Sequence, residues 1–436
     1  MTQDTASNQA SIPPESIWGR GETHHLGPLT SDVSHGVCVV GAGVSGLCTA
    51  FELSCRGHDV VVLEAAAPGG GETTRSTAHL VTALDERYMT IERQRGIEIA
   101  RAAASAHSGG ITWLEALVRE QAIACDFARV TGTLVVGRDR ASEADTLLSA
   151  ELAAATRAGV RCERVSSHEV FPGGAILFPD QAQLDPNAFV SGLARVLAER
   201  GVRIYARTEA VDWNEEAGGV VVATSAGAAV RAEHVILATH DLPARVAPRV
   251  RRLTAHSSFV VALRAPDGTA RQTGSLLWDG YWDRGDPYHY VRGARGQSNG
   301  ARIGSADHDL LLVGGEDIEG REPIGERAAY DRLERWARAH FPQVGERVGA
   351  WWGTIMEPEG EFALIGHVPG NQRTLVIAGD SGNGFTYAAI AAQRIASLID
   401  PLHTNPQDPI KEAMYGPSSE PRTQHAMSSR RGSVSV

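Results

Sequence analysis

Three glycines near the start of the chain have the spacing of a phosphate-binding turn. Gly41, Gly43 and Gly46 form the pattern G-x-G-x-x-G directly after the apolar run 37–40. The first glycine permits a tight turn, the second lets the backbone approach a pyrophosphate, and the third allows a helix to pack closely on the strand. The helix expected at about 44–56 would direct its unpaired N–H groups and the positive end of its dipole at that phosphate.

An acidic residue follows at the spacing expected of a dinucleotide site. Glu64 follows a second expected strand, 59–63, at the place where a carboxylate accepts hydrogen bonds from an adenosine ribose. Because the glycines follow a strand, open a helix and precede this acid, the segment is interpreted as a dinucleotide-binding unit. The alternative is a glycine-rich turn in an α/β domain without a nucleotide. A free ribose 2′-hydroxyl is implied, so NADP is not expected, but these residues do not separate FAD from NAD.

A second glycine-rich turn, 379–384, lies between an apolar strand at 375–378 and a helix expected at about 385–399. Such a turn aims N–H donors and the positive end of the helix dipole at one spot. If the dinucleotide is FAD, its flavin gains negative charge near N1 and C2=O when it is reduced, and a positive pole placed there would stabilise that charge. A plain helix N-terminus with a tight turn is the alternative.

Side chains suited to substrate binding occur together near residue 290. In an extended strand, Tyr288, Tyr290 and Arg292 share one face, and His289 lies on the other. An arginine beside a tyrosine hydroxyl would suit a substrate carboxylate. The alternative is an edge strand with a solvated arginine and tyrosines packed in the core.

Further aromatic and histidine side chains have two interpretations each. The aromatic side chains could form a wall of the substrate site or simply pack a loop; they are Trp278, Tyr281 and Trp282. His240 follows the apolar run 235–239, where it would either line a cofactor site or cap the end of a strand.

The composition is that of a globular protein. The chain has 436 residues, of which 42% are hydrophobic and 21% are charged, which is enough for two or more domains. The net charge of −11 and the lack of a long basic run make nucleic acid a poor candidate partner. Lys411 is the only lysine, so lysine is almost removed from the candidate catalytic groups.

The five cysteines show neither C-x-x-C nor a Cys/His ligand spacing, and we expect no metal site. Their odd number and the lack of a secretory signal favour a cytoplasmic protein. No apolar stretch approaches the length of a membrane span. The sequence leaves the oligomeric state open.

Periodicity predicts the elements that must position these residues. Helices are expected near 86–107, 110–122 and 143–158, and another begins at Pro186 after the N-cap residue Asp185. Short strands separated by polar turns are expected within 202–230, followed by a buried strand at 235–239. Further strands within 255–315 precede a helix at about 325–340.

Four blocks of the sequence, in order, resemble the D-amino-acid oxidase superfamily of FAD-dependent oxidoreductases. They are VVGAGVSGLCTAFELSCRGHDVVVLEA with GGGETTRSTAHL, then QAQLDPNAFVSGLARVLAERGVRIYARTEAVDW, then VILATHDLP, and finally WWGTIMEPEGEFALIGHVPGNQRTLVIAGDSGNGFTYAAIAA. The segments GGETTRSTAHL, ILFPDQAQLDP and LLLVGGED are most similar to a branch that often carries a Rieske domain. No Cys-x-His with Cys-x-x-His follows residue 400, so we expect no Rieske cluster in this sequence.

The resemblance implies an α/β fold. A GR2-type FAD/NAD(P)-binding Rossmann-like domain would carry a second, substrate-binding domain with an antiparallel sheet. The implied parts are an N-terminal arm at 1–35, which would pack through Ile17 and Trp18, FAD-binding segments at 36–85, 160–250 and 350–400, substrate-binding segments at 86–159 and 251–349, and a flexible tail at 401–436.

Matching positions of the family imply which residues bind FAD. The turn and the start of its helix would hold the pyrophosphate, an acid and its neighbour the ribose, and a following loop would approach the flavin. A strand residue would meet the adenine, two residues would follow the buried strand, and the second glycine turn would face the flavin pyrimidine. The pyrophosphate would be held by Gly41, Ala42, Gly43, Val44, Ser45 and Gly46, and the ribose by Glu64 and Ala65. The loop that approaches the flavin contains Thr73, Thr74, Arg75 and Ser76, and the strand residue that meets the adenine is Val211. The buried strand is followed by Thr239 and His240, and the flavin pyrimidine would face Gly382, Asn383, Gly384, Phe385 and Thr386.

Non-covalent FAD is the expectation. Some relatives attach the flavin through a cysteine in the segment that reads WWGTIMEPEG here, which has none. Others use a histidine after the second strand, but His79 lies three residues beyond the usual place, which Ser76 occupies.

The family reaction is oxidation of a C–N bond by hydride transfer to flavin N5, and the resemblance implies a small-molecule amine or amino-acid-like substrate. The residues proposed to serve it are Arg292, Tyr290, His289 and Trp352. Oxygen or another acceptor would reoxidise the flavin. Some oxidases of the family use a lysine over the flavin to activate oxygen, and here no lysine lies outside the tail. Either an arginine or a histidine replaces it or oxygen is not the acceptor, which weakens an oxidase relative to a dehydrogenase. The alternatives are a flavin monooxygenase acting on an aromatic or natural-product-like substrate and a non-catalytic flavin-binding protein.

Overall fold

A computed structural model describes most of the chain. The described residues are 15–19, 26–137, 140–168, 170–171, 173–266, 275–279, 288–295, 297–298, 301–302, 309–400 and 409–418. Only the backbone is described for 275–279, 297–298 and 301–302. The predicted aromatic side chains Trp278, Tyr281 and Trp282 therefore lie outside what the structure describes. No helix in the described part of the chain is both long enough and apolar enough to cross a membrane.

The first sheet has a parallel centre, in the strand order β18-β19-β10-β1-β2-β7, and a meander in which β8 pairs β9 and β9 pairs β10. Its strands are β1 (Val33–Val40), β2 (Val60–Leu63), β7 (Arg203–Tyr205), β8 (Ala210–Glu216), β9 (Gly219–Thr224), β10 (Ala229–Leu237), β18 (Leu364–His367) and β19 (Thr374–Ala378). The pairs of β1 with β2, β1 with β10, and β10 with β19 are all parallel. Buried parallel strands read as unbroken apolar runs, which is why 37–40 and 60–63 could be recognised.

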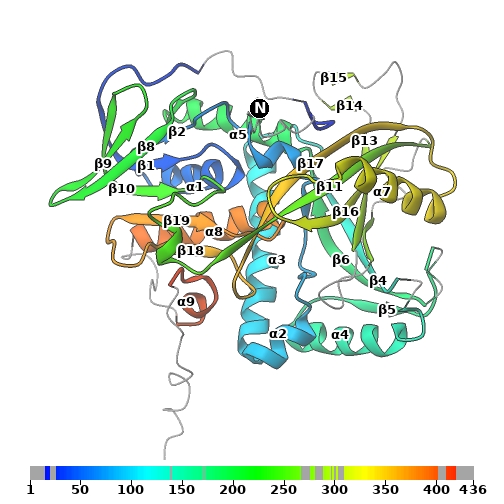
Figure 1. The fold of residues 1–436 in the computed structure, drawn as a ribbon. Coiled ribbons are helices and arrows are strands. Elements are labelled where there is room, and N and C mark those ends of the chain that lie inside the picture. Colours follow the sequence, from blue (N-terminus) through cyan, green and yellow to red (C-terminus); the bar gives the residue numbers. More distant parts are fainter. Residues whose placement is uncertain are drawn as a thin grey trace, which may run out of the picture.

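Both faces of this sheet are covered. Val37 and Val39 of β1 pack with the cluster formed by the helices α1 (Val44–Cys55), α5 (Pro186–Glu199) and α8 (Gly384–Ile399). Cys38 and Val40 point the other way, into the cluster under the meander. Figure 1 shows α1 and α8 close together beside the sheet.

The second sheet is mostly antiparallel, in the order β17-β11-β16-β13-β12-β4-β6-β3, with β5 paired to β6. Its strands are β3 (His79–Leu80), β4 (Ala128–Val135), β5 (Glu163–Val165), β6 (Ala175–Gln183), β11 (Leu253–Ala265), β12 (Ser275–Asp279), β13 (His289–Arg295), β16 (Asp309–Glu319) and β17 (Arg347–Pro358). The amphipathic helix α7 (Glu326–His340) packs its buried residues on this sheet. A small pair, β14 (Gln297–Ser298) and β15 (Ala301–Arg302), is separate.

The remaining helices are α2 (Tyr88–Arg95), α3 (Ile97–Glu120), α4 (Ala144–Ala158) and α9 (Pro409–Tyr415), with short 3₁₀ turns η1 (Glu72–Arg75) and η3 (Ala247–Arg249). The predicted helix break at 108–110 is wrong, because α3 continues through it. The break instead falls at Gly96, which has φ +88°. Gly110 serves contact with α8, since a Cβ there would lie 3.2 Å from the Thr386 carbonyl oxygen.

Strands within all three of the expected FAD-binding segments pair in the second sheet. They are β3 within 36–85, β5 and β6 within 160–250, and most of β17 within 350–400. Strand pairing partners are long-range, so the sequence could indicate these strands but not the sheet that they join.

The described residues 15–19 of the N-terminal arm pack on the second sheet. Ile17 and Trp18 are buried against β11 and β16 side chains of the second sheet. The Trp18 indole N–H donates to the Ser76 carbonyl oxygen at 2.9 Å. The arm therefore supports the loop that follows β2.

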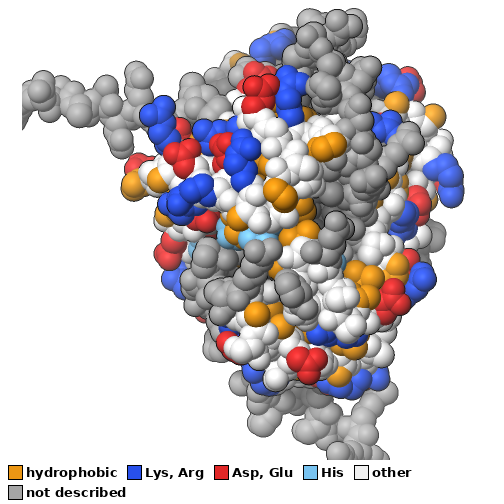
Figure 2. Space-filling model, turned by 90° about the vertical axis from the view of Figure 1, so that its right-hand side faces the viewer, with side chains coloured by type: hydrophobic (Ala, Val, Ile, Leu, Met, Phe, Trp, Pro, Cys, Tyr) orange, Lys and Arg blue, Asp and Glu red, His pale blue; other side chains and the backbone are white. Residues whose placement is uncertain are grey.

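On the face shown in Figure 2, charged side chains of both signs are interspersed among neutral and apolar ones.

We predict that Asp185→Ala lowers the free energy of unfolding by about 1–2 kcal/mol, because it removes an N-cap. The Asp185 carboxylate accepts the N–H groups of Asn187 and Ala188 at 2.9 Å at the start of α5. Asp185→Asn, which can still accept these bonds, is the matched control and should lose less than half as much. Urea unfolding followed by circular dichroism measures both. Equal losses in the two variants would show that capping is not the cause.

Candidate active site

The two glycine-rich turns meet at one cavity. A cavity of about 430 Å³ lies where the carboxyl ends of the parallel strands face the second sheet, and it is lined by Gly41 and Gly43 of the first turn and by Gly382 and Gly384 of the second. The two turns are more than 300 residues apart in the chain. In open α/β sheets this edge is the general location of ligand sites.

The first turn requires its glycines for different reasons. Gly41 has φ +107°, and a Cβ on it would lie 2.4 Å from the Ala238 carbonyl oxygen. A Cβ on Gly46 would lie 1.9 Å from the Gly41 carbonyl oxygen, so α1 could not pack this closely. Gly43 differs, because its Cβ would meet only the Thr73 hydroxyl, at 3.1 Å, and would otherwise project into open space. Gly43 is therefore the glycine that keeps space for a ligand.

Glu64 fixes the rim of the first turn. Its carboxylate accepts the backbone N–H of Ala42 and that of Ala66, each at 2.8 Å. The residue lines the cavity at the end of β2. The same carboxylate can thus hold the turn in place and present an acceptor to a ligand.

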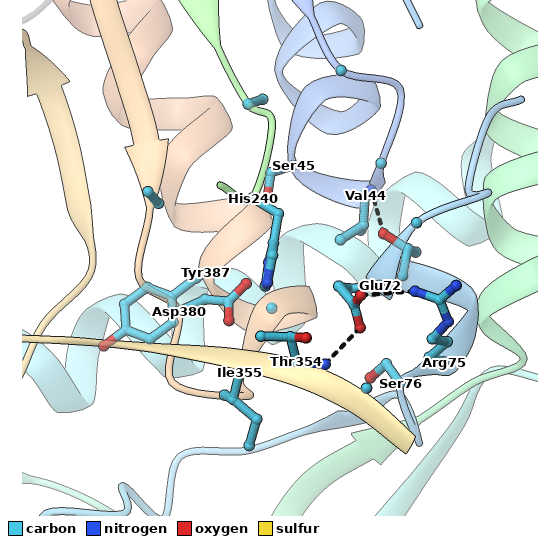
Figure 3. A pocket seen from close by; sticks show the side chains of 18 of the residues that line it. Val44, Ser45, Glu72, Arg75, Ser76, His240, Thr354, Ile355, Asp380 and Tyr387 are labelled. Atoms are coloured by element: carbon cyan, nitrogen blue, oxygen red, sulfur yellow. Dashed lines mark hydrogen bonds and ion pairs between the residues drawn. The ribbon is translucent and has the colours of Figure 1, made fainter. Parts of the chain in front are cut away.

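The loop from 69 to 76 closes one side of the cavity. The Thr73 hydroxyl accepts the N–H of Val44 at 3.1 Å and so ties the loop to the start of α1. Glu72 accepts the Thr354 N–H at 2.8 Å and pairs with Arg75 at 2.7 Å. Figure 3 shows these three contacts around the cavity.

The second turn presents a helix N-terminus without a side-chain cap. The N-cap residue of α8 is Asn383, whose side chain makes no capping bond and instead donates to Asp85 at 2.8 Å. Gly382 has φ +82°. The free N–H groups and the positive end of the α8 dipole therefore face the cavity and favour negative charge there.

His240 is an unusual residue in the cavity wall. It follows β10 with φ +62°, which is uncommon for a residue other than glycine. Its Nε2 atom is buried and has no hydrogen-bond partner among the described residues. Burial raises the pKa of Asp380, and the charge of His240 acts in the opposite direction. Both side chains point into the same space in Figure 3. An unpaired buried nitrogen on a strained backbone indicates a position built for a ligand.

The end of the cavity nearest the second sheet is lined by hydroxyl-bearing and aromatic side chains. Ser258, Tyr288 and Tyr290 contribute from β11 and from the start of β13, and His79 lies with its ring 5.4 Å from that of Tyr290. Burial, helped by the charge of Arg292, lowers the pKa of His79 to about 4. His79 is therefore neutral near pH 7.

The structure brings together most of the predicted cofactor residues at this one cavity. Those that line it are Gly41, Gly43, Val44, Ser45, Glu64, Ala65, Thr73, Arg75, Ser76, Thr239, His240, Gly382, Gly384 and Phe385, together with Tyr290 from the substrate set. Ala42, Gly46, Thr74, Asn383 and Thr386 lie behind this surface. Thr74, for example, donates to the Gly69 carbonyl oxygen, and Thr386 accepts the Val81 N–H.

Arg292 does not reach the cavity, which corrects its expected role. It shares a face of β13 with Tyr290, but its guanidinium is buried and donates to the carbonyl oxygens of Thr77, Ala78 and Leu184. The guanidinium carbon also lies 5.3 Å from the Trp18 ring centroid. Its donors are used to hold the loop between the arm and the cavity, so they are not available to a substrate carboxylate.

Three other predicted residues are placed away from the cavity. The His289 ring stacks on Trp336 and pairs with Glu316 at 3.2 Å. Trp352 is buried in the core under α7, whereas its neighbour Gly353 lines the cavity. Val211 is 56% exposed, and the cavity is lined instead by the preceding residues 208–210. The last two errors are shifts of one residue along a strand, which reverse the side that a side chain faces.

Several lining residues gave no signal in the sequence. Asp85 and Ser258 are isolated polar residues in segments without a motif. Glu72 and Asp380 stood within quoted motifs, yet only the structure shows that their carboxylates border the cavity. Among the described residues, no three His, Cys, Asp or Glu side chains gather as metal ligands would.

Two packed sheets, a parallel one with a dinucleotide-type turn and an antiparallel one that closes its cavity, define a two-part flavoprotein-like fold. The family model described as "FAD dependent oxidoreductase" (DAO) matches residues 36–398, and the chain belongs to this family.

Individual proteins of similar sequence or structure include oxidoreductases. The chain is 27% identical over 234 residues to a putative Rieske 2Fe-2S iron–sulfur protein of Bacillus subtilis, covering 53% of this chain and 45% of the relative. It is 27% identical to the gamma-glutamylputrescine oxidoreductase of Escherichia coli, covering 85% of each. The chain spans only about half the length of the first two curated relatives that it matches, namely 45% of the Bacillus subtilis protein and 58% of a probable oxidoreductase of Haemophilus influenzae. The crystal structure of glycine oxidase from Geobacillus kaustophilus has a TM-score of 0.68 at 19% identity, covering 84% of this chain and 95% of that one, and shows the fold.

The residues present fit FAD. The uncapped start of α1 beside Gly43 suits a pyrophosphate, Glu64 suits the ribose, and the uncapped start of α8 suits the electron-rich end of a reduced flavin. His240, whose Nε2 has no hydrogen-bond partner among the described residues, lines the same cavity.

We predict that Gly43→Ala keeps the fold but weakens FAD binding by about tenfold or more, because its new methyl group occupies the space of the pyrophosphate. Gly109→Ala is the matched control, since nothing lies within 4 Å of a Cβ there. Titration of flavin-free protein with FAD, with a thermal melt of each variant, measures both effects. Unchanged FAD affinity in Gly43→Ala would contradict the placement of the pyrophosphate.

Proposed function

We propose that the protein oxidises a C–N bond of a small amine or amino-acid-like substrate. The observation that carries the proposal is the convergence of both glycine turns and the tyrosine wall on one cavity. FAD, when bound, supplies the acceptor for the hydride at N5. The residues of the chain then have to bind the substrate, orient it and keep water away.

The second sheet supplies the surface for the substrate. Tyr288, Tyr290, Ser258 and Val260 line the cavity opposite the first turn, with Ile355 from β17. Burial raises the pKa of both tyrosines, so both hydroxyls keep their protons at neutral pH. With His79 neutral as well, this wall offers hydrogen bonds without a net positive charge. Such a surface suits an amine that must arrive with its nitrogen lone pair free.

The names of the relatives support this class of substrate. One relative is named for gamma-glutamylputrescine and another for glycine, and they align over 85% and 84% of this chain. The electron acceptor is proposed to be one other than oxygen, because no lysine lies within the family match at 36–398.

The test is anaerobic mixing of the purified holoprotein with a panel of amines and amino acids. We expect at least one to bleach the flavin absorbance, and admission of air to restore it slowly. Bleaching by none of the panel, with consumption of NAD(P)H and oxygen instead, would contradict the proposal and favour a monooxygenase.

We predict that the flavin is bound without a covalent link. The segment of β17 beside the cavity contains no cysteine. His79, the histidine in the loop after the second strand, has its Nδ1 atom in contact with the Thr77 hydroxyl at 3.0 Å. Acid precipitation should therefore leave all FAD in the supernatant, measured by absorbance. Yellow colour that stays with the pellet would contradict this.

A further inference from the structure

The sequence block VGGED, within β16, builds a feature that the proposed reaction does not explain. β11 and β16 pair with a shift in register between Ser257 and Phe259, which face Ile318 and Gly315. Ser258 therefore stands opposite two residues, Glu316 and Asp317, as in a β-bulge. Glu316 has φ +58°. Bulges are frequent beside active sites, where they redirect side chains.

The bulge sends its two carboxylates in different directions. Glu316 turns to the side of α7, where it pairs with His289 at 3.2 Å and with Arg332. Asp317 turns to the cavity side, where its Oδ2 accepts the Tyr288 hydroxyl at 3.0 Å. Its other oxygen, Oδ1, is buried. Strands β11, β16 and β13 are neighbours in the sheet (Figure 1).

The glycines of the same block make room for the tyrosine wall. A Cβ on Gly314 would lie 2.1 Å from the Tyr290 ring, and one on Gly315 would lie 2.0 Å from the Tyr288 carbonyl oxygen. The two rings lie 6.0 Å apart. The block VGGED thus positions both tyrosines and places a carboxylate behind one of them.

The direction of the hydrogen bond decides what Tyr288 can offer to a ligand. Because its O–H donates to Asp317, the hydroxyl of Tyr288 can offer a ligand in the cavity an acceptor but not a donor. A substrate carboxylate needs a donor there, whereas an ammonium group needs an acceptor. The lining adds the carboxylates of Asp85 and Asp380, while the guanidinium of Arg75 is paired with Glu72 at 2.7 Å.

We propose that Asp317, placed by the bulge, is a positioning residue that fixes Tyr288 as an acceptor and makes this end of the cavity select substrates carrying a second, cationic amine. The proposal rests on the proposed function and narrows its substrate class to diamine-like compounds. Asp317 is not itself part of the cavity lining, so it acts through Tyr288 and through its charge.

Protonation of Asp317 should remove this selectivity. Burial raises the pKa of Asp317 to about 6, against the opposing effects of Ser258, Tyr288 and His256, and Glu357 adds to the rise. Below about pH 6 the neutral acid no longer attracts a cation. The pairing with Glu357 raises the pKa of His256, and a positive charge on His256 would act in the same direction.

The test uses three probes of equal chain length that differ only in their far end, namely 1,4-diaminobutane, 1-aminobutane and 4-aminobutanoate. Dissociation constants come from the perturbation of the oxidised flavin spectrum, and reduction rates from anaerobic mixing. We expect the diamine to bind about tenfold more tightly than 1-aminobutane at pH 8, with 4-aminobutanoate the weakest. Equal binding of the three probes, or a preference for 4-aminobutanoate, would overturn the inference.

Asp317→Asn should abolish the preference for the diamine while leaving the binding of 1-aminobutane within about twofold. Glu319→Gln is the matched control, since it removes an exposed charge from the same strand and should change neither. Because Asp317→Asn already lacks the preference, lowering the pH below 6 should change the relative binding of the probes in this variant only through His256. A retained preference in the folded variant would refute the role of Asp317.

If Asp317→Asn does not fold, Tyr288→Phe provides the decision, because it removes the acceptor oxygen and keeps the ring. It should also lose the preference for the diamine, and retention would count against the inference. Failure of the proposed function can be distinguished from failure of this inference. If no probe reduces the flavin, the reaction is wrong, whereas reduction without a diamine preference leaves the reaction standing and refutes only the selectivity.

Discussion

The parallel arrangement of β1, β2, β10 and β19 is the constraint on which the site depends. Val40 lies beside Leu63 and Leu237, and Leu237 lies beside Val376, so the carboxyl ends of all four strands meet at one edge. Each strand then delivers one part of the cavity, namely a glycine turn, an acid, a strained histidine and a second glycine turn. Segments that are distant in sequence form one site because the carboxyl ends of neighbouring parallel strands lie at the same edge of the sheet.

The features that sequence could predict are those with local physical causes. Asp185 caps α5 because an aspartate before a proline satisfies the first N–H groups of the helix, and this needs no tertiary contact. The glycine turns, Glu64 and the buried strands are equally local. The error at 108–110 had a tertiary cause, since the small residue Gly110 is required by the approach of α8 rather than by a turn.

The substrate side was predicted less well, because side-chain alternation gives a face but not what that face meets. Tyr290 and Arg292 share a face of β13, yet one lines the cavity and the other is buried against the loop at 77–78. Arginine was expected to bind a carboxylate, but both arginines of the predicted site bind the protein itself. Arg75 pairs with Glu72, and Arg292 holds three backbone carbonyl oxygens. What remains around the cavity is a set of hydroxyls and carboxylates, with an electrostatic character that composition alone does not show.

The most direct test of the account is whether the two turns hold opposite ends of one FAD. Binding of ADP and of riboflavin to flavin-free protein should be measured for Gly43→Ala and for Gly384→Ala, whose Cβ would lie 2.9 Å from the Asp380 carboxylate. The account predicts that the first variant loses affinity for ADP alone, that the second loses affinity for riboflavin alone, and that both lose affinity for FAD. If both variants weakened the same fragment, or if neither changed FAD binding, the central claim would be contradicted.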